Sequence, residues 1–596
     1  MRVLTENEFK VLRAIVLSPC GNQRSLAEAA GVSLGSANRA LKSLSERGMV
    51  EGYESTESGR ACLDRYRVDN AVIMAAGLSS RFAPISYEKP KGLLVVRGEV
   101  LIERQIRQLQ EAGITDITVV VGYKKAHFFY LEREFGVKIA VNDEYASRNN
   151  NSSLMVVREQ LGNTYICSSD DYFTVNPFEK YVYKAFYAAT FVEGETKEWC
   201  IKQGVGGRIE SVTVGGRDSL VMLGHVYFDR AFSRTFVDIL EREYDLPATA
   251  DKLWEEIYAD HIKEFDMVAR PYGDDIVHEF DSLDELRDFD PYFLRNVDSE
   301  VFDNIVAVLG CDVDSIHDVY PLKQGLTNLS CHFAVGDDEY VYRHPGAGTE
   351  LIIDREAELV AQSLAKDLGL DDTYIFEDPS QGWKISRFIP GSRQLDPSNS
   401  DQVRRAMEMA RALHESPMQT RRAFDFYDES KKYAALYEEA KGRIDIEGFQ
   451  EMAAKADRLK KHLESDGARR CLTHNDFFSL NFLIDESDKM YLIDWEYSGM
   501  SDYASDFGTF VVCSELDYER AEEALSFYFG RTPSFEELRH NFGYVAMAGW
   551  CWYVWSLFKE AQGEHVGEWL YIYYRYAVNY LDKVISWYEN GAEQDA

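Results

Sequence analysis

Hydrophobic positions in the first 66 residues recur at the spacing of short amphipathic helices, which are followed by a small ribbon. The segment QRSLAEAAGVSLGSANRALKSLSERGMV reads as a helix, a glycine-containing turn and a second helix, with Ser33 placed to cap the second helix. The segment GYESTESGRACL is predicted to form a wing after these helices. Residues 1–67 are therefore predicted to fold as a helix-turn-helix module with a wing.

Short apolar runs alternate with helical segments from about Val68 to Asp290. The runs AVIMAAG, ITDITVVVGY, KIAVND and TYICSSDDYF each have the length and composition of a buried strand. This alternation predicts a doubly wound parallel sheet over residues 68–296. Ligands of such sheets bind at the carboxyl ends of the strands.

The pattern changes again at about Val301. The segment FAVGDDEYVYRHPG predicts a hairpin with polar turn residues, whereas Asp401 to Tyr588 is mostly helical and is interrupted by the apolar segment MYLIDWE. A small β-rich lobe followed by a larger helical lobe is the outline of a kinase-like fold. We therefore expect a multidomain chain of α/β and α+β class, with its third domain over residues 297–596.

Composition narrows the class of protein. The formal net charge of -36 argues against a general nucleic-acid binder, because a polyanion would be repelled, but it leaves room for a local basic pocket. Nine cysteines lack metal-binding spacing and suit a reducing cytoplasm. The first residues do not resemble a signal peptide, and VAMAGWCWYVWSLF is too short to span a bilayer. We expect a cytoplasmic protein without membrane insertion.

The first 66 residues resemble the winged-helix modules of bacterial regulators. Their basic and acidic residues nearly balance, and little beyond Arg39 and Lys42 is offered to a phosphate backbone. DNA binding by this module and a packing or dimerisation role therefore both remain open.

A phosphate-binding turn is predicted after the first strand of the middle domain. Ala75, Ala76 and Gly77 are small, so backbone N–H groups can approach a triphosphate closely, and the positive end of the next helix faces it. Arg81 and Lys91 add fixed positive charge where negative charge develops on a transferred phosphorus. We expect both side chains to be catalytic.

The segment MAAGLSSRFAP, with KPKGLL after it, resembles the signature of sugar-nucleotide-type nucleotidyltransferases, although Ser79 stands where that family commonly has Gly. Within that superfamily the segment is most similar to CTP:phosphocholine cytidylyltransferases. The segments VVVGYKKAHF, NNNSSL, SSDDYF, EWCIKQGVGGRIESV, LGHVYFDRAF and HEFDSLDELRDF all have counterparts there, in the same order. The resemblance implies that Asn150 contributes to nucleotide binding.

Nucleotidyl transfer requires Mg²⁺ held by one or two carboxylates and by the substrate phosphates. Asp170 follows a predicted strand, where a metal ligand belongs, and the resemblance implies Asp281 as the second ligand. Asp171 is the alternative to Asp170, because it is adjacent but points to the other side of the strand. Trp199 is either a cation–π partner for a quaternary ammonium or part of the core.

A second constellation lies in the third domain. THNDFFSLNFLI places His474, Asp476 and Asn481 in the pattern His-x-Asp-x-x-x-x-Asn, and Asp494 follows in LIDWE. A phosphotransferase needs a carboxylate that accepts a hydroxyl proton, for which we expect Asp476. It also needs an Asn and an Asp that hold Mg²⁺ on ATP, for which we expect Asn481 and Asp494.

This domain resembles choline/ethanolamine kinases and the related aminoglycoside phosphotransferases. PLKQGLTNLS is similar to the kinase loop over the phosphates, which implies nucleotide contacts from Thr327 and Asn328. YVYRHPGAGTELIIDREAE is similar to a second family segment, except for its histidine after the arginine. That resemblance places Arg343 where protein kinases have their ATP-binding lysine, and pairs it with Glu358.

Aromatic residues in GWCWYVWSLF are candidates for recognising a choline headgroup, which has no hydrogen-bond donor on nitrogen. Such a stripe is more often helical core, so we expect two of Trp550, Trp552 and Trp555 to be core and one, Trp552 or Trp555, to reach the ligand. Tyr573 and Tyr574 lie further along the chain, and Glu496 is a candidate for the carboxylate of this pocket.

The two predicted chemistries are consecutive. One site would phosphorylate choline with ATP, and the other would couple phosphocholine to CTP, releasing pyrophosphate and CDP-choline for decoration of a cell surface. Two alternatives remain. One is a sugar-1-phosphate nucleotidyltransferase joined to an ethanolamine or aminoglycoside kinase. The other is a DNA-binding regulator that uses the catalytic folds as sensors.

Overall fold

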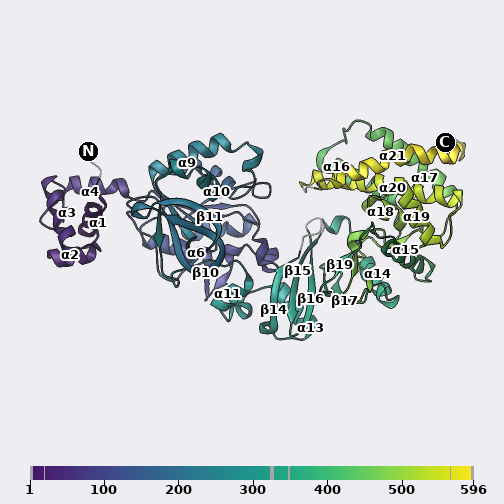
Figure 1. Ribbon diagram of the computed structural model, residues 1–596, viewed down its shortest axis with the longest axis horizontal. Coiled ribbons are helices and arrows are strands. Elements are labelled where there is room, and N and C mark those ends of the chain that lie inside the picture. Colours follow the sequence, from purple (N-terminus) through teal and green to yellow (C-terminus); the bar gives the residue numbers. More distant parts are fainter. Residues whose placement is uncertain (1–3, 19, 323–327, 347–348, 564–565, 592–596) are drawn as a thin grey trace. The chain divides into compact units, whose positions relative to one another are not determined.

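Figure 1 shows a computed structural model of the chain, which describes residues 4–18, 20–322, 328–346, 349–563 and 566–591. Contacts divide the chain into two units. The first runs to Val306, and the second holds most of the chain after it. All nine cysteines are free, and of these only Cys311 is partly exposed. In the described part of the chain, every helix is too short or too polar to cross a membrane.

The N-terminal module follows the hydrophobic pattern closely. Ser33 caps α3 by accepting a hydrogen bond from the backbone of Ser36, as the sequence predicted. The predicted wing is shorter than expected, because Thr56 caps a further helix by accepting a hydrogen bond from Gly59. The elements are α1 (Glu6–Leu17), α2 (Gln23–Ala29), α3 (Leu34–Glu46), β1 (Val50–Glu51), β2 (Glu54–Ser55) and α4 (Glu57–Leu63).

A seven-stranded sheet in the order β12-β10-β11-β8-β3-β6-β7 forms the middle of the first unit. Strands β3 (Asn70–Ala75), β6 (Ile117–Val121), β7 (Lys138–Val141) and β8 (Thr164–Ser168) are parallel, as predicted. The hydrophobic pattern did not predict the long antiparallel pair beside them. It consists of β10 (Phe186–Gln203) and β11 (Ile209–Phe228), and β12 (Val268–Pro271) lies parallel to β10 at the edge.

Helices cover both faces of this sheet. Successive strand side chains point to opposite sides, so an apolar strand presents apolar side chains to both faces. Ala71 and Ile73 of β3 pack in one cluster with Ile106 of α6, whereas Val72 packs in another with Val120 and Val157. The helices are α5 (Ile85–Glu88), α6 (Leu101–Glu111), α7 (Tyr130–Phe135), α8 (Asn151–Val156), α9 (Arg230–Glu243), α10 (Trp254–Asp260), α11 (Leu283–Phe289) and α12 (Phe293–Asn296). Two small ribbons join β4 (Val95–Val96) to β5 (Glu99–Val100) and β9 (Tyr172–Phe173) to β13 (Val277–His278).

The last domain begins with a small lobe around a five-stranded sheet in the order β14-β15-β16-β18-β17. Arg343 of β16 lies opposite Lys384 of β18, and Lys384 lies opposite Glu377 of β17, so three charged side chains share one row. The elements are α13 (Glu300–Leu309), β14 (Ile316–Pro321), β15 (Asn328–Val335), β16 (Asp338–Pro345), α14 (Arg355–Asp367), β17 (Tyr374–Asp378) and β18 (Trp383–Arg387).

A helical lobe completes this domain, and its longest helix, α20, packs along α21 (Figure 1). Ser534 and Glu537 form a reciprocal capping box at the start of α20. The helices are α15 (Ser400–Glu415), α16 (Phe426–Lys441), α17 (Phe449–Ser465), α18 (Ala504–Cys513), α19 (Tyr518–Phe529), α20 (Phe535–Ala561) and α21 (Trp569–Asn590). Short strands flank the catalytic segment: β19 (Arg393–Gln394), β20 (Arg470–Thr473), β21 (Phe482–Ile484), β22 (Met490–Leu492) and β23 (Gly499–Asp502).

Candidate active sites

A cavity of about 470 Å³ opens at the carboxyl ends of β3 and β8 in the middle domain. Its wall includes Ala75, Ala76 and Gly77 from the turn after β3, and Asp170 from the turn after β8. These two parallel strands are neighbours in the sheet, which brings the phosphate-binding turn next to the first predicted metal ligand. The cavity lies where the sheet topology places a ligand.

Lys91 reaches this cavity from the segment that follows α5. Its ammonium nitrogen lies 2.5 Å from Asp170 Oδ2, donates a hydrogen bond to the backbone carbonyl of Phe280, and lies 4.3 Å from the centre of the Phe82 ring. The side chain is largely buried, so its charge is held in place by these contacts. The structure thus brings together Lys91 and Asp170, two residues that sequence analysis assigned to one reaction.

Arg81 and Asp281 form a second ion pair, with Arg81 Nη1 2.5 Å from Asp281 Oδ1. Neither residue lines the cavity, and both side chains are exposed. Each of the two predicted catalytic cations of this domain therefore pairs with one of its two predicted metal ligands.

Asp171 is buried beside Asp170 and does not line the cavity. Neither of its carboxylate oxygens has a hydrogen-bond partner among the described residues. Burial raises the pKa of Asp171 well above its usual range, and the charges of Glu279 and Asp170 add to this effect. The protein that surrounds Glu279 and the nearby charge of Asp170 raise the pKa of Glu279 to about 7. Sequence analysis quoted the segment around Glu279 but assigned no role to it.

Asn150 lines the cavity and connects it to a third acidic side chain. Its amide nitrogen donates to Glu255 Oε2 at 3.2 Å, and its amide oxygen accepts a hydrogen bond from the backbone of Trp254 at 2.7 Å. Glu255 also accepts a hydrogen bond from the hydroxyl of Tyr187 at 3.3 Å. Burial raises the pKa of Glu255 to about 7. Glu255 and Tyr187 were missed by sequence analysis because they belong to no local motif.

Trp199 is not among the residues that line this cavity. It lies on β10 opposite Val214 and packs against the buried cluster that contains Phe232 and Phe236. Trp199 is only partly buried there, and its two sequence interpretations stay open.

Asp506 of α18 holds the segment of the last domain that carries the predicted base Asp476. Its two carboxylate oxygens accept hydrogen bonds from the backbone N–H groups of His474 at 3.0 Å and Asn475 at 2.6 Å. The imidazole of His414 lies 2.8 Å from the same carboxylate. Asp506 therefore fixes the backbone of the two residues that precede Asp476. It was not found from sequence because it lies about thirty residues downstream of the motif.

Asp476 and Asn481 face each other across this segment, with Asn481 Nδ2 donating to Asp476 Oδ2 at 2.8 Å. Burial raises the pKa of Asp476 well above its usual range, with further contributions from the charges of Asp494 and Glu496. The negative charges of Asp494 and Glu496 thus act on Asp476, and a bound cation would reduce this repulsion.

Arg343 forms ion pairs with this acidic group. Its Nη1 atom lies 2.6 Å from Glu358 Oε1 and 3.2 Å from Asp494 Oδ1, which brings together three residues predicted for nucleotide and metal binding. Asn328 donates a hydrogen bond to Glu496 Oε2 at 2.8 Å. Thr327, the other predicted contact of this loop, lies outside the described residues.

Glu496 contacts this charged group, because Arg343 lies 3.8 Å and Arg355 3.7 Å from its carboxylate. That Glu496 also supplies the carboxylate of the aromatic pocket stays a prediction. The ring of its neighbour Tyr497 stands nearly at a right angle to Trp552, with 5.3 Å between ring centres.

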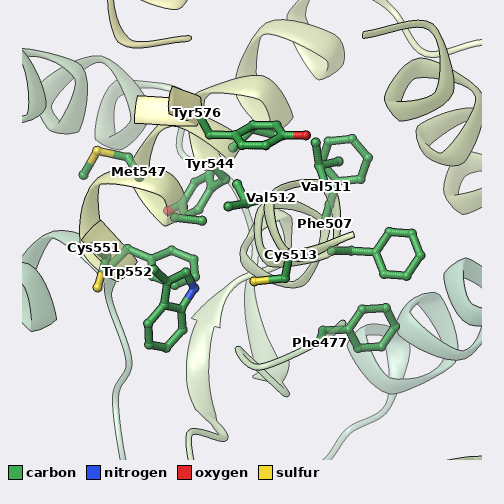
Figure 2. Close-up of a cluster of buried hydrophobic side chains, with 14 of the residues drawn as sticks. Phe477, Phe507, Val511, Val512, Cys513, Tyr544, Met547, Cys551, Trp552 and Tyr576 are labelled. Atoms are coloured by element: carbon green, nitrogen blue, oxygen red, sulfur yellow. The ribbon is translucent and has the colours of Figure 1, made fainter. Parts of the chain in front are cut away.

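All three tryptophans of α20 are buried. Trp550 donates a hydrogen bond to the hydroxyl of Ser430, whereas the indole nitrogens of Trp552 and Trp555 have no partner among the described residues. Figure 2 shows Trp552 in the cluster that α20 forms with Cys513 of α18. Buried indole N–H groups usually find a partner, so Trp552 and Trp555 are better placed than Trp550 to meet a ligand.

Comparisons with known proteins divide the chain into the same three parts. Residues 4–62 match the MarR family, residues 71–175 match the MobA-like NTP transferase domain, and residues 318–540 match the phosphotransferase enzyme family. Over 217 residues the chain is 33% identical to a choline-phosphate cytidylyltransferase of Streptococcus pneumoniae, covering 36% of this chain and 95% of that protein. The chain belongs to this cytidylyltransferase family.

A second relative within this family, a 2-aminoethylphosphonate cytidylyltransferase of Lancefieldella rimae, is 33% identical over 234 residues, covering 38% of this chain and 95% of that protein. The structure of choline kinase LicA from Streptococcus pneumoniae is 27% identical, with a TM-score of 0.42, and covers 47% of this chain and 97% of that chain. This cytidylyltransferase family member is thus a transferase with a winged-helix module, a nucleotidyltransferase domain and a kinase domain. The predicted three-part architecture is confirmed.

The oxygen donors of both sites fit Mg²⁺, the metal that nucleotidyltransferase and kinase families generally use. Among the residues that the structure describes, no three His, Cys, Asp or Glu side chains are grouped to hold a metal alone. Mg²⁺ does not require such a cage, because it binds through one or two carboxylates, waters and substrate phosphates. Asp170 and Asp281 stay the predicted ligands in the cytidylyltransferase domain, and Asp494 and Asn481 stay the predicted ligands in the kinase domain.

Proposed function

We propose that the protein makes CDP-choline in two steps. The kinase domain phosphorylates choline with ATP, and the cytidylyltransferase domain then transfers a cytidylyl group from CTP to phosphocholine and releases pyrophosphate. The observation that carries the proposal is the presence in one chain of two sets of site residues for adjacent reactions, one around Asp170 and one around Asp476.

In the first step Asp476 accepts the proton of the choline hydroxyl as its oxygen attacks the γ-phosphorus of ATP. Burial and the acidic neighbours of Asp476 raise its pKa, which strengthens it as a base. Mg²⁺, held by Asn481 and Asp494, would neutralise charge on the phosphates of ATP. Arg343 would bind those phosphates, and Glu358 would orient Arg343.

Buried aromatic side chains of the kinase domain support a quaternary ammonium substrate. Burial raises the pKa values of Tyr497 and Tyr573, and the negative charge of Asp476 adds to both shifts. Trp552 packs against Tyr497. Aromatic faces attract a quaternary ammonium, which lacks hydrogen-bond donors.

In the second step the phosphate of phosphocholine attacks the α-phosphorus of CTP in line, and pyrophosphate leaves. The turn from Ala75 to Gly77 and the side chain of Asn150 would bind CTP in the cavity. Lys91 and Arg81 would stabilise the charge that develops on the α-phosphoryl group. Asp170 and Asp281 would hold the Mg²⁺ that accompanies the nucleotide.

A specific observation favours a second candidate for the acceptor of this step. Glu255 and Glu279 have carboxylates with raised pKa values close to the cavity residues, and carboxylates are natural acceptors for the N–H groups of a primary ammonium. A phosphorylated or phosphonylated primary amine is therefore the alternative acceptor. The relative named for 2-aminoethylphosphonate makes this alternative concrete.

Phosphorus NMR of the purified protein with Mg²⁺, ATP and CTP tests the proposal. With choline added, phosphocholine should form first and then convert to a CDP diester, while parallel samples contain ethanolamine or 2-aminoethylphosphonate. If phosphocholine forms but no CDP diester follows, the proposed kinase step stands and phosphocholine is excluded as the acceptor of the cytidylyl group. If products form only with the primary amines, a primary amine and not choline is the substrate.

Substitutions separate the two steps. Asp476→Ala should abolish choline phosphorylation but leave CDP-choline formation from added phosphocholine nearly intact. Lys91→Ala should have the opposite effect. Loss of both activities in either folded variant would contradict two independent sites. Lys138→Ala, which removes an exposed ion pair with Asp116 on the edge strand β7, serves as the control.

A further inference from the structure

The first turn of α13 belongs structurally to the first unit. Sequence analysis assigned residues 297–596 to the kinase domain, whereas contacts place the chain up to Val306 in the unit that holds the cytidylyltransferase domain. Val301, Phe302 and Ile305 of this helix are buried. The turn lies outside the ranges that match the NTP transferase domain and the phosphotransferase family. Its contacts within the first unit are therefore a feature that neither match accounts for.

Glu88, the last residue of α5, is bound by this turn. Its Oε1 atom accepts a hydrogen bond from the backbone N–H of Val301 at 3.0 Å. The first four N–H groups of a helix have no partner inside the helix, so a side-chain acceptor at this place stabilises the helix and is itself fixed. Glu88 lies three residues before Lys91. The hydrogen bond therefore anchors the segment from which Lys91 projects.

Lys89 provides a second anchor on the same turn. Its ammonium donates hydrogen bonds to the backbone carbonyl of Asp298 at 2.7 Å and to the carboxylate of Asp298 at 3.0 Å. The Asp298 side chain is 95% exposed, so the ion pair adds little to the contact with the carbonyl. Two consecutive residues of the segment, Glu88 and Lys89, are thus held by the chain just before and within α13.

Pro90 connects these anchors to Lys91 with little conformational freedom. Its φ angle is −61°, and Lys89 before it is extended, with φ −132° and ψ 143°. A proline restricts both its own φ angle and the conformation of the residue before it. After Lys91, Gly92 packs so closely on Ser169 that a side-chain carbon would lie 2.8 Å from the Ser169 Cβ atom. The backbone of Lys91 is therefore fixed from both sides.

We propose that the first turn of α13 positions Lys91 for cytidylyl transfer, with Glu88 and Lys89 as the positioning residues. The inference rests on the proposed cytidylyltransferase function, in which Lys91 stabilises charge that develops on the α-phosphoryl group. That interaction is stronger in the transition state than in the bound substrate. A loosened anchor should therefore lower kcat more than it raises KM.

The test compares Glu88→Ala with Glu88→Gln in the full chain, with CTP and added phosphocholine. Glu88→Ala should lower the kcat of cytidylyl transfer about tenfold, because a small displacement of a catalytic group is costly. The KM values for CTP and phosphocholine should change by less than about twofold. Glu88→Gln should keep most of the wild-type kcat, because its amide oxygen can still accept the hydrogen bond from Val301.

Two controls accompany these variants. Choline phosphorylation should stay unchanged in both, because the kinase site residues lie in the second unit. Glu132→Ala, which removes an exposed glutamate of α7, is the matched control and should leave cytidylyl transfer unchanged.

Lys89→Gln tests the second anchor, and its side chain is 33% exposed, so folding should not depend on it. It should lower kcat by about threefold, and Lys89→Arg, which keeps a donor for the Asp298 carbonyl, should lose less. Wild-type kcat in Glu88→Ala, an equal loss in Glu88→Gln, or a change in KM alone would overturn the inference. If Glu88→Ala does not fold, unchanged kcat in Lys89→Gln overturns it. A wild-type protein that transfers no cytidylyl group would instead refute the proposed cytidylyltransferase function.

Discussion

Ion pairs join candidate metal ligands to candidate phosphate-binding cations in the cytidylyltransferase domain. Lys91 pairs with Asp170, and Arg81 pairs with Asp281. A divalent ion arriving alone must compete with these cations, whereas a metal–nucleotide complex also offers phosphates to the displaced Lys91 and Arg81. Metal and nucleotide should therefore each strengthen the binding of the other.

Arg81→Gln tests this exchange because it should change two affinities in opposite directions. Without CTP, Mn²⁺ should bind about threefold more tightly or better, since Asp281 no longer has a competing partner. With CTP, nucleotide binding should weaken. Electron paramagnetic resonance of free Mn²⁺ measures the first effect, in an Asp494→Asn background that removes the other candidate metal site. Weaker Mn²⁺ binding in the absence of CTP would contradict the exchange.

Sequence motifs predicted the side chains whose place depends on a few neighbouring residues. Lys91, Asp170 and Asn150 follow strands or turns in fixed order, and all three line the same cavity. Glu496 lies two residues beyond Asp494, but its direction depends on how the two lobes of the kinase domain pack. Glu255 reaches its site only through tertiary packing, which no local spacing encodes.

At the scale of elements, helix α18 connects the core of the kinase domain to its catalytic segment. Asp506 near its start binds the backbone of the segment, and Gly508 allows the helix to approach α20 closely. A side-chain carbon at Gly508 would lie 2.5 Å from the backbone oxygen of Tyr544, which cannot move easily inside a buried helix. The sequence predicted a mostly helical region from Asp401 to Tyr588, but not which of its helices meet.

Gly508→Ala should therefore destabilise the kinase domain by about 2 kcal/mol or more and should reduce choline phosphorylation, because α18 and α20 must separate. Cytidylyl transfer should be unaffected. Differential scanning calorimetry with separate assays of the two activities measures this. Gly35→Ala in α3, where a side chain meets open space, is the control and should leave both activities unchanged.

The start of α20 contains a charged cluster around a buried histidine. His540 lies 2.8 Å from Asp466 and 3.0 Å from Asp502. Burial opposes its charge, but hydrogen bonds and the charges of these two carboxylates outweigh burial and raise the pKa of His540. This cluster stabilises the fold fully at pH values below the pKa of histidine in the unfolded chain. The stabilisation is lost as the pH rises through the raised pKa of His540 in the folded protein.

His540→Gln should accordingly lower the free energy of unfolding more at pH 6 than at pH 9. Chemical denaturation of the variant and the wild type at both pH values gives the difference directly. His127→Gln, whose side chain is exposed in the first unit, should show no such pH dependence. An equal loss at both pH values would mean that His540 acts through packing rather than charge.

At the scale of the whole molecule, the N-terminal module is fixed to the cytidylyltransferase domain. The ring of Phe9 packs against Tyr66 and Tyr183, the hydroxyl of Tyr183 donates to the backbone of Leu4, and Arg13 pairs with Glu179 at 2.6 Å. The polypeptide between the two domains is also tied by a backbone hydrogen bond from Val68 to Lys180. These contacts support a packing role for the module, and DNA binding remains an open alternative.

Tyr183→Ala should lower the thermal midpoint of the first unit by several degrees, because it removes two ring contacts and a hydrogen bond at this interface. Kinase activity should stay unchanged. Calorimetry with Tyr571→Ala, an exposed tyrosine of α21, as the control distinguishes the interface from a general loss of an aromatic ring. An unchanged midpoint would show that the module is not part of the folded unit.

Because almost every thiol is buried, the remaining cysteine is a selective site for attaching a fluorescent dye. Because eight of its nine cysteines are buried, a maleimide dye should react first at Cys311, near the boundary between the two units. One engineered cysteine on the surface of either unit would then complete a donor–acceptor pair. Single-molecule energy transfer along such a pair could follow the spacing of the two units as ATP, CTP and the amine are added one at a time.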